Sequence, residues 1–321
     1  MTSISKHEGS SNEVKKVNKG DMISSLPDCL LVHILSFLPT KYAVGTSILS
    51  SRWKHLWASV PTLDFDVNLR FKPVQSFLAS SSNFMNFVDR VLLHHDLSCI
   101  QKFCLCTHSI DTYIGESRIY TWISEAIERG VQELDIEFDQ DTYDINLPLN
   151  LFTCPTLVSL ELRDRISFNV PRSVHFESLK VLHVSISYPD NDLTQYLFCN
   201  CPVLEDLLIE GEVESNEELL FDVSTPSLTR FELDLEANIS DDCANKIVVN
   251  APILEYLTLE DDYLPCYVLE NLNSLVIAIV HVGDCCIKTK ATKQHADRVL
   301  AILRGIIGYI FWCVYIYIYM T

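Results

Sequence analysis

The sequence predicts an α+β chain in which a short three-helix unit precedes an α/β repeat solenoid, with a parallel sheet on the concave face. Three observations predict this fold: helical apolar spacing in residues 21–66, a leucine pattern that recurs from residue 130, and enough apolar residues for a large core. Of the 321 residues, 48% are hydrophobic, whereas only 12 are Pro and 9 are Gly. This composition excludes a mostly disordered or collagen-like chain.

Acidic residues dominate the charge of the chain. The formal net charge is −19, and the isoelectric point lies near 4.8. Phosphate would be repelled by this field, so we expect no nucleic-acid partner. The sequence contains neither GxGxxG nor GxxxxGK[ST], the glycine-rich motifs that cradle phosphates. We therefore expect no nucleotide cofactor.

Residues 21–66 predict three short helices behind a polar leader, residues 1–20, which is expected to be disordered. In the first helix Pro27 suits the first turn, and Pro39 ends it. A second helix is expected from about Lys41, and a third is expected around Trp53. So small a unit buries too little apolar surface to be stable alone. A partner or a neighbouring domain should therefore cover its remaining apolar face.

Residues 67–129 form a less regular region, which we interpret as a connection that carries an irregular first repeat. Amphipathic helices are predicted at 83–95 and 117–129. A short strand is predicted between them, in the sequence FCLCTH.

A sequence repeat extends from residue 130 to residue 280. The pattern apolar-x-x-apolar-x-apolar occurs seven times, beginning with Val131, Leu134 and Ile136, at intervals of 18–26 residues. This is the leucine-rich-repeat signature. Each repeat predicts a short strand with inward leucines, and the repeats must stack because none can bury its leucines alone.

In each predicted strand, the residues between the inward leucines point outward. These outward positions are the candidates for target binding. Residues 130–270 contain 29 acidic and 6 basic side chains. Two interpretations stay open: an acidic concave face that recognises a basic protein segment, or acidic residues that only keep the solenoid soluble. The candidate target-binding residues are Glu133, Asp135, Glu137, Glu161, Arg163, His183, Asp206, Glu210, Arg230, Glu232, Asp234, Tyr256 and Glu260.

The 12 cysteines are interpreted as reduced thiols. Residues 1–20 lack the apolar core of a secretory signal, so an intracellular location is expected. Zinc is disfavoured because no C-x₂₋₄-C pair is matched by a second pair at zinc-finger spacing, and we expect no metal site. Cys154 and Cys201 occupy a position that Thr225 and Ala251 hold in sister repeats, which indicates a structural slot for small residues.

The C-terminal segment combines a predicted helix, ADRVLAILRGI, with an uncharged aromatic tail at 305–321. The tail has 16 apolar or neutral residues from Gly305 to Met320, which is short of the roughly 20 that span a bilayer. A membrane partner is therefore not favoured. A tail anchor and a translated noncoding dinucleotide repeat remain as alternatives.

Residues 21–66 resemble the F-box motif of plant F-box proteins that also carry leucine-rich repeats. The matching segments are LPDCLL (Leu26–Leu31), ILSFLPTK (Ile34–Lys41), LSSRWKHLW (Leu49–Trp57) and VPTLDFD (Val60–Asp66). Residues 281–304 resemble the opening of the FBD region that ends many such proteins, and the chain departs from that region after Ile306.

This resemblance implies a non-catalytic substrate-recognition subunit of an SCF-type ubiquitin ligase in the nucleus or the cytoplasm. The F-box would dock on a Skp-type adaptor, which connects to a cullin and a RING protein, and the repeats would bind an unknown target. Exposed Trp side chains are expected among the contacts. The candidate adaptor-binding residues are Leu26, Pro27, Leu30, Leu31, Ile34, Leu35, Leu38, Pro39, Val44, Trp53, Leu56 and Trp57.

The sequence pattern also fits one other class of protein and disfavours another. A repeat scaffold without ligase assembly, tail-anchored or a nonfunctional truncated product, would share the same sequence pattern. An enzyme is disfavoured because no nucleophile elbow or HExxH motif accompanies the histidines. No catalytic residue is therefore assigned.

Overall fold

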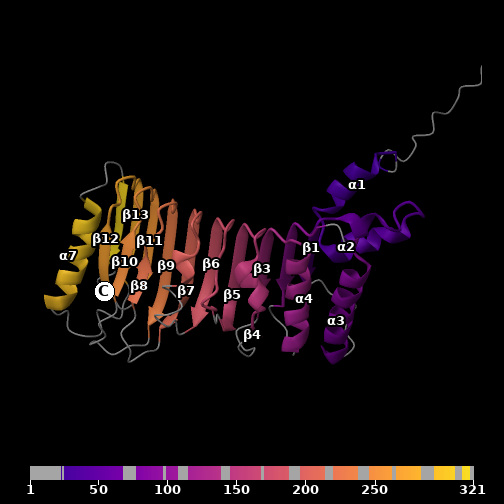
Figure 1. The fold of residues 1–321 in the computed structure, drawn as a ribbon, viewed down its shortest axis with the longest axis horizontal. Coiled ribbons are helices and arrows are strands. Elements are labelled where there is room, and N and C mark those ends of the chain that lie inside the picture. Colours follow the sequence, from indigo (N-terminus) through magenta and orange to yellow (C-terminus); the bar gives the residue numbers. More distant parts are fainter. Residues whose placement is uncertain are drawn as a thin grey trace, which may run out of the picture.

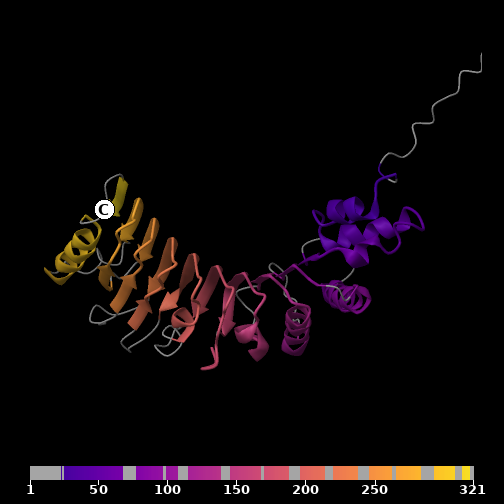
Figure 2. The same cartoon turned by 45° about the horizontal axis from the view of Figure 1, so that its top comes forward.

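The chain folds into an arc-shaped solenoid with a helical unit at its N-terminal end (Figures 1 and 2). The structure is a computed structural model that describes residues 23, 25–67, 77–96, 99–107, 115–138, 145–167, 170–187, 196–213, 220–237, 246–261, 265–282, 293–307 and 313–318. The polar leader expected at residues 1–20 lies outside the described residues.

The N-terminal helical unit, residues 25–60, contains α1 (Asp28–Leu35) and α2 (Thr40–Gly45). Pro27 and Pro39 directly precede these helices, where the missing N–H of proline costs no helical hydrogen bond. The predicted third helix is wrong, because two single-turn 3₁₀ helices, η1 (Thr46–Ile48) and η2 (Leu56–Ser59), flank a run of turns instead. Serines at positions 50 and 51 favour turns because their hydroxyls compete for backbone hydrogen bonds.

The solenoid is built on one large parallel sheet, in the order β1-β2-β3-β5-β6-β7-β9-β11-β13-β14, with β4 beside β5. The strands are β1 (Thr62–Asp66), β2 (Lys102–Cys106), β3 (Glu133–Glu137), β4 (Ile145–Asn146), β5 (Ser159–Ser167), β6 (Val181–Ser187), β7 (Asp206–Val213), β9 (Arg230–Ala237), β11 (Tyr256–Asp261), β13 (Ile277–Val282) and β14 (Cys313–Ile318). The sheet follows the inner side of the arc (Figure 2). The prediction of a solenoid with a parallel sheet on its concave face is confirmed.

The sheet begins earlier than the expected start of the repeats at residue 130. β1 pairs in parallel with β2, and β2 pairs with β3. Phe65 and Phe103 occupy the inward positions of these strands and are buried. Val60, Leu63 and Phe65 follow the spacing of the later repeats, and so do Ile100, Phe103 and Leu105. The repeat pattern therefore extends before residue 130, and the strand predicted in FCLCTH is β2.

The outer side of the arc changes from helices to strands along the chain. In the first half it carries α3 (Phe77–His94), α4 (Glu116–Glu128) and η3 (Leu149–Thr153), so the helices predicted at 83–95 and 117–129 are confirmed with earlier starts. In the second half it carries a three-stranded parallel sheet, β12-β10-β8. These strands are β8 (Leu220–Val223), β10 (Lys246–Asn250) and β12 (Cys266–Glu270).

Inward side chains of the sheet form one continuous core. Leu160, Leu182 and Leu207 are fully buried, as their place in the repeat pattern predicts. Cys154, Cys201, Thr225 and Ala251 are buried too, which confirms the small-residue slot.

The C-terminal segment continues the solenoid. α7 (Lys293–Ile307) packs beside β12, and β14 adds to β13 in parallel. Part of the tail expected at 305–321 is therefore a strand of the sheet. Among the described helices, none combines the length and the apolar character that crossing a membrane requires.

Candidate functional site

The first candidate surface lies on the N-terminal helical unit, where α1 is apolar on two faces. Leu31 and Leu35 point inward and are at most 1% exposed. Leu30 and Ile34 point outward and are 46% and 44% exposed. Together with further exposed side chains they form what we call the N-terminal apolar surface: Leu30, Ile34, Phe37, Leu38, Tyr42, Ile48 and Leu49.

The predicted adaptor-binding residues divide into those that are at least partly exposed, of which Leu30, Ile34 and Leu38 belong to this surface, and those in the core of the unit. Exposed or half-buried members are Leu26, Pro27, Leu30, Ile34, Leu38, Pro39, Val44 and Trp57. Fully inward members, which form the small core with Ala43 and Val60, are Leu31, Leu35, Trp53 and Leu56. Trp53, one of the predicted adaptor-binding residues, is only 5% exposed and belongs to the core of the unit.

Helical spacing did not identify every exposed apolar side chain of the unit. Phe37 and Ile48 are 73% and 88% exposed, yet Phe37 lies in a turn and Ile48 lies in η1. The available signal was compositional: a unit this small cannot bury so many large apolar residues.

The unit is joined firmly to the sheet. The Trp57 side chain packs against both the small core and the solenoid core. The Asp64 amide donates to Thr40 Oγ1 at 2.7 Å, and His95 Nε2 lies 2.8 Å from the Val60 carbonyl oxygen. The N-terminal apolar surface is thereby held at a fixed place relative to the repeats.

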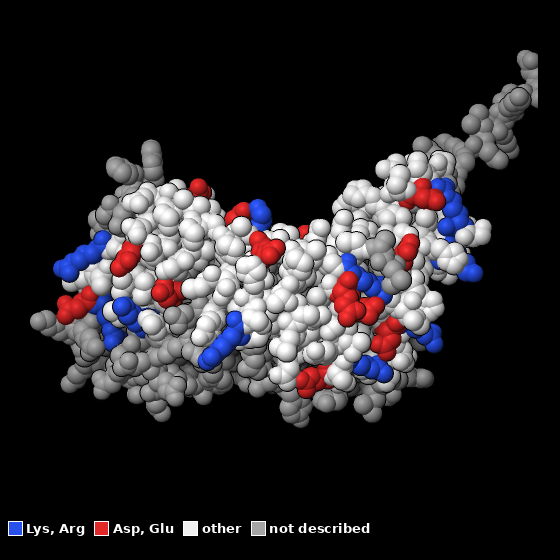
Figure 3. All heavy atoms as spheres, in the orientation of Figure 1, with Lys and Arg blue, Asp and Glu red and all other residues white. Residues whose placement is uncertain are grey.

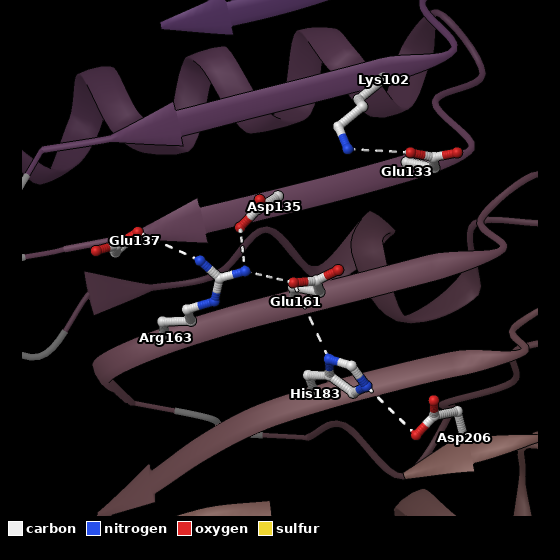
Figure 4. A network of polar contacts seen from close by, with 8 residues as sticks. All are labelled: Lys102, Glu133, Asp135, Glu137, Glu161, Arg163, His183 and Asp206. Carbon is white, nitrogen blue, oxygen red and sulfur yellow. Dashed lines mark hydrogen bonds and ion pairs between the residues drawn. The ribbon is translucent and has the colours of Figure 1, made fainter. Parts of the chain in front are cut away.

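The second candidate surface is the concave face of the large sheet. Each predicted target-binding residue lies at an outward strand position and is exposed or half-buried. The Arg163 guanidinium lies 2.6 Å from Glu161, 3.4 Å from Glu137 and 3.7 Å from Asp135 (Figure 4). This ion-paired cluster therefore spans β3 and β5.

His183 extends the network to the next strands. Its imidazole lies 4.0 Å from Glu161 and 3.4 Å from Asp206 (Figure 4). The hydrogen bond to Asp206 raises the pKa of His183 above its ordinary value. Acidic and basic side chains are seen together in the hollow at the upper edge of the molecule in Figure 3.

Two cysteine thiols and the metal-binding residue types bear on what a reactive site requires. Burial raises the pKa of the Cys104 and Cys201 thiols to about 12, so neither is a ready nucleophile at neutral pH. No group of three or more His, Cys, Asp or Glu side chains in the part of the chain that the structure describes could hold a metal ion. Both surfaces are suited to contact with proteins.

Comparisons with known proteins agree with this geometry. Residues 23–64 match the F-box domain, and residues 119–284 match the leucine-rich repeats of the FBD-associated F-box protein At5g56370. The domain match covers the N-terminal helical unit and the first residues of β1. No solved structure matches the chain.

Similar full-length proteins come from Arabidopsis thaliana. The F-box/LRR-repeat protein At4g14103 is 37% identical over 279 residues, which cover 86% of this chain and 70% of that relative. The F-box/FBD/LRR-repeat protein At5g22700 is 36% identical over 272 residues, which cover 83% of this chain and 60% of that relative. The chain thus spans about two thirds of the length of these relatives. It belongs to the family of F-box proteins with leucine-rich repeats.

Proposed function

We propose that this chain is the substrate-receptor subunit of an SCF-type ubiquitin ligase. The N-terminal apolar surface docks on a Skp-type adaptor, which connects the chain to a cullin and a RING protein. The concave face holds the target. The chain makes no bond itself; it raises the effective concentration of a target lysine near the ubiquitin-carrying enzyme.

The proposal rests on α1, a short helix that has one set of buried apolar side chains and a second set of exposed ones. Leu31 and Leu35 complete the unit's own core, so Leu30 and Ile34 are not needed for it. Large exposed apolar side chains gathered on a small unit are typical of a protein-binding surface. Because Trp57 and Thr40 join this unit to the sheet, a docked adaptor would be held at a fixed distance from a bound target.

We place this activity in the nucleus or the cytoplasm. Cys29, Cys99, Cys199 and Cys266 are free and exposed thiols. Such thiols stay reduced in those compartments.

Adaptor binding is tested with the full chain and a purified Skp-type adaptor in a calorimetric titration. The triple variant Leu30→Ala, Ile34→Ala, Leu38→Ala removes outward side chains only. We expect it to weaken adaptor binding by at least about a hundredfold, because alanine at a few central apolar contacts removes most of an interface's free energy.

The matched control replaces three apolar side chains that are exposed elsewhere: Leu93→Ala, Leu149→Ala and Leu300→Ala. It should bind the adaptor as the wild type does. Equal affinity for both triple variants, or no binding of the adaptor by the wild type, would favour a repeat scaffold without ligase assembly. Trp53→Ala is unsuitable, because removing a buried tryptophan tests folding.

A further inference from the structure

The concave face carries carboxylates in both of its halves. Between β2 and β6, cations lie against the carboxylates, as in the Arg163 cluster. Further along, Glu210 on β7 is in register with Asp234 on β9, which is in register with Glu260 on β11. We call these three residues the acidic ladder.

The acidic ladder is unfavourable for the protein by itself. Neighbouring strands lie about 4.7–4.9 Å apart, and like charges at directly opposed positions destabilise a sheet. The nearest described cations offer partial relief: Arg230 pairs with Glu232 at 2.6 Å, and His281 Nδ1 lies 3.0 Å from Glu260. Cations supplied by a partner would remove the remaining repulsion.

An apolar patch adjoins the acidic ladder on the same face. It consists of Tyr256 on β11 with Ile277 and Ile279 on β13. Tyr256 is in register with Ile277 and is 42% exposed, and both isoleucines are half-buried. These side chains point away from the core, because they alternate with the buried Leu257 and Ala278.

We propose that this half of the concave face binds a segment of the target protein in which Lys or Arg side chains stand beside apolar ones. The inference rests on the proposed function and names the chemistry of the target. Carboxylates form strong charge-assisted hydrogen bonds with Lys and Arg, and the Tyr256 ring can take a cation on its face. The isoleucines bury the apolar side chains of the segment.

The combination of features selects this partner over simpler ones. An apolar segment without cations would strip water from the carboxylates of the acidic ladder, which is costly. A basic segment without apolar side chains would leave the patch uncovered. Solubility alone requires neither carboxylates in register nor an apolar patch beside them.

Binding is tested with the full chain and fluorescein-labelled peptides, by fluorescence anisotropy in about 0.15 M NaCl, where long-range attraction is screened. The probe is Gly-Arg-Leu repeated three times. The comparison peptides replace leucine with serine, or arginine with glutamate. We expect the probe to bind about tenfold more tightly than the serine peptide, and the glutamate peptide not to bind.

Two triple variants with the same change in net charge locate the site. The first neutralises the acidic ladder with Glu210→Gln, Asp234→Asn and Glu260→Gln, and should weaken probe binding at least about tenfold. The control neutralises exposed carboxylates on α4, in a turn and on β12, with Glu128→Gln, Glu177→Gln and Glu270→Gln. The control should bind the probe as the wild type does.

The proposal is overturned if both variants lose affinity equally, since binding would then follow net charge. It is also overturned if the serine peptide binds as tightly as the probe, or if the probe does not bind. The assay contains no adaptor, so these outcomes leave adaptor docking untouched. Conversely, if the chain binds the peptide but not the adaptor, the ligase assignment is refuted and the peptide-binding proposal stands.

Discussion

At the scale of single residues, Arg52 shapes the N-terminal helical unit. Its guanidinium lies 2.6 Å from the Asp28 carboxylate at the start of α1 and donates to the Leu26 carbonyl oxygen. Arg52 comes from the run of turns between η1 and η2, where a third helix was predicted. One side chain therefore connects the turns to the first residues of the unit.

Arg52→Ala should destabilise the unit. The ion pair is partly exposed, so water screens it, and the loss should be about 1 kcal/mol. Urea unfolding of the full chain measures this loss. The neighbouring substitution Lys54→Ala removes an exposed cation and should leave the midpoint unchanged. Equal effects of both substitutions would mean that net charge, and not the Arg52 contacts, is responsible.

His95 makes the stability of the junction depend on pH. Burial lowers the pKa of His95, while the hydrogen bond to Val60 opposes that shift. Below the ordinary histidine pKa the unfolded chain therefore binds the proton more readily than the folded chain does. Stability should fall as the pH drops from about 7 toward 5, by up to about 1.4 kcal/mol for each unit of pKa difference.

The pH effect is measured by urea unfolding of the wild type and of His95→Gln across this range. Glutamine can keep a hydrogen bond to Val60 but does not titrate, so the variant should lose less stability on acidification. The pKa of His183 is raised, so its protonation favours the folded state. His183→Gln should therefore lose more stability on acidification than the wild type does. A steeper loss in His95→Gln would refute the assigned sign.

At the scale of elements, the outer side of the arc is completed by α7. Ile302 and Ile306 are buried in the solenoid core, and Gly305 lies directly against Leu269 next to them. A Cβ atom at Gly305 would be only 2.8 Å from the Leu269 Cβ. This close approach is the reason that a glycine stands inside the helix.

Gly305→Ala should loosen α7 although alanine is the better helix former. The gain in helix propensity is about 1 kcal/mol, whereas overpacking typically costs about 1–3 kcal/mol. Hydrogen exchange of the α7 amides should therefore become faster. Arg304→Ala, at the exposed neighbouring position, is the control and should leave exchange unchanged. Slower exchange in Gly305→Ala would mean that propensity outweighs the contact.

At the scale of the whole molecule, two cores are joined by Trp57. The small core of the N-terminal helical unit and the solenoid core are separate clusters of buried residues, and Trp57 packs against both. Repeats contact mainly their neighbours, so cooperativity along a solenoid depends on each interface. The junction is such an interface.

Trp57→Ala should uncouple the unfolding of the two parts. We expect the N-terminal helical unit to unfold at lower temperature than the repeats, so that one calorimetric transition becomes two. Lys54→Ala again serves as the control and should preserve a single transition. A single, uniformly shifted transition in Trp57→Ala would show that other contacts, such as Thr40 with Asp64, carry the coupling.

The sequence alone determined the repeat architecture and the identity of the concave face. Leucine spacing fixed which side chains are buried in β3 to β13, because strand alternation leaves each residue only two directions. The strand predicted in FCLCTH is β2, whereas β1 and the sheet β8-β10-β12 were not predicted. Segments of four or five residues carry too little periodic signal to be assigned.

Tertiary structure decided what the candidate surfaces contain. Both faces of α1 are apolar, so only packing could separate Leu30 and Ile34 from Leu31 and Leu35. Alternation placed Arg163 and Glu210 on the same face, but only strand register assigned one to an ion-paired cluster and the other to the acidic ladder. The physical reason is that alternation is a property of one strand, whereas contacts between side chains depend on which strands are neighbours.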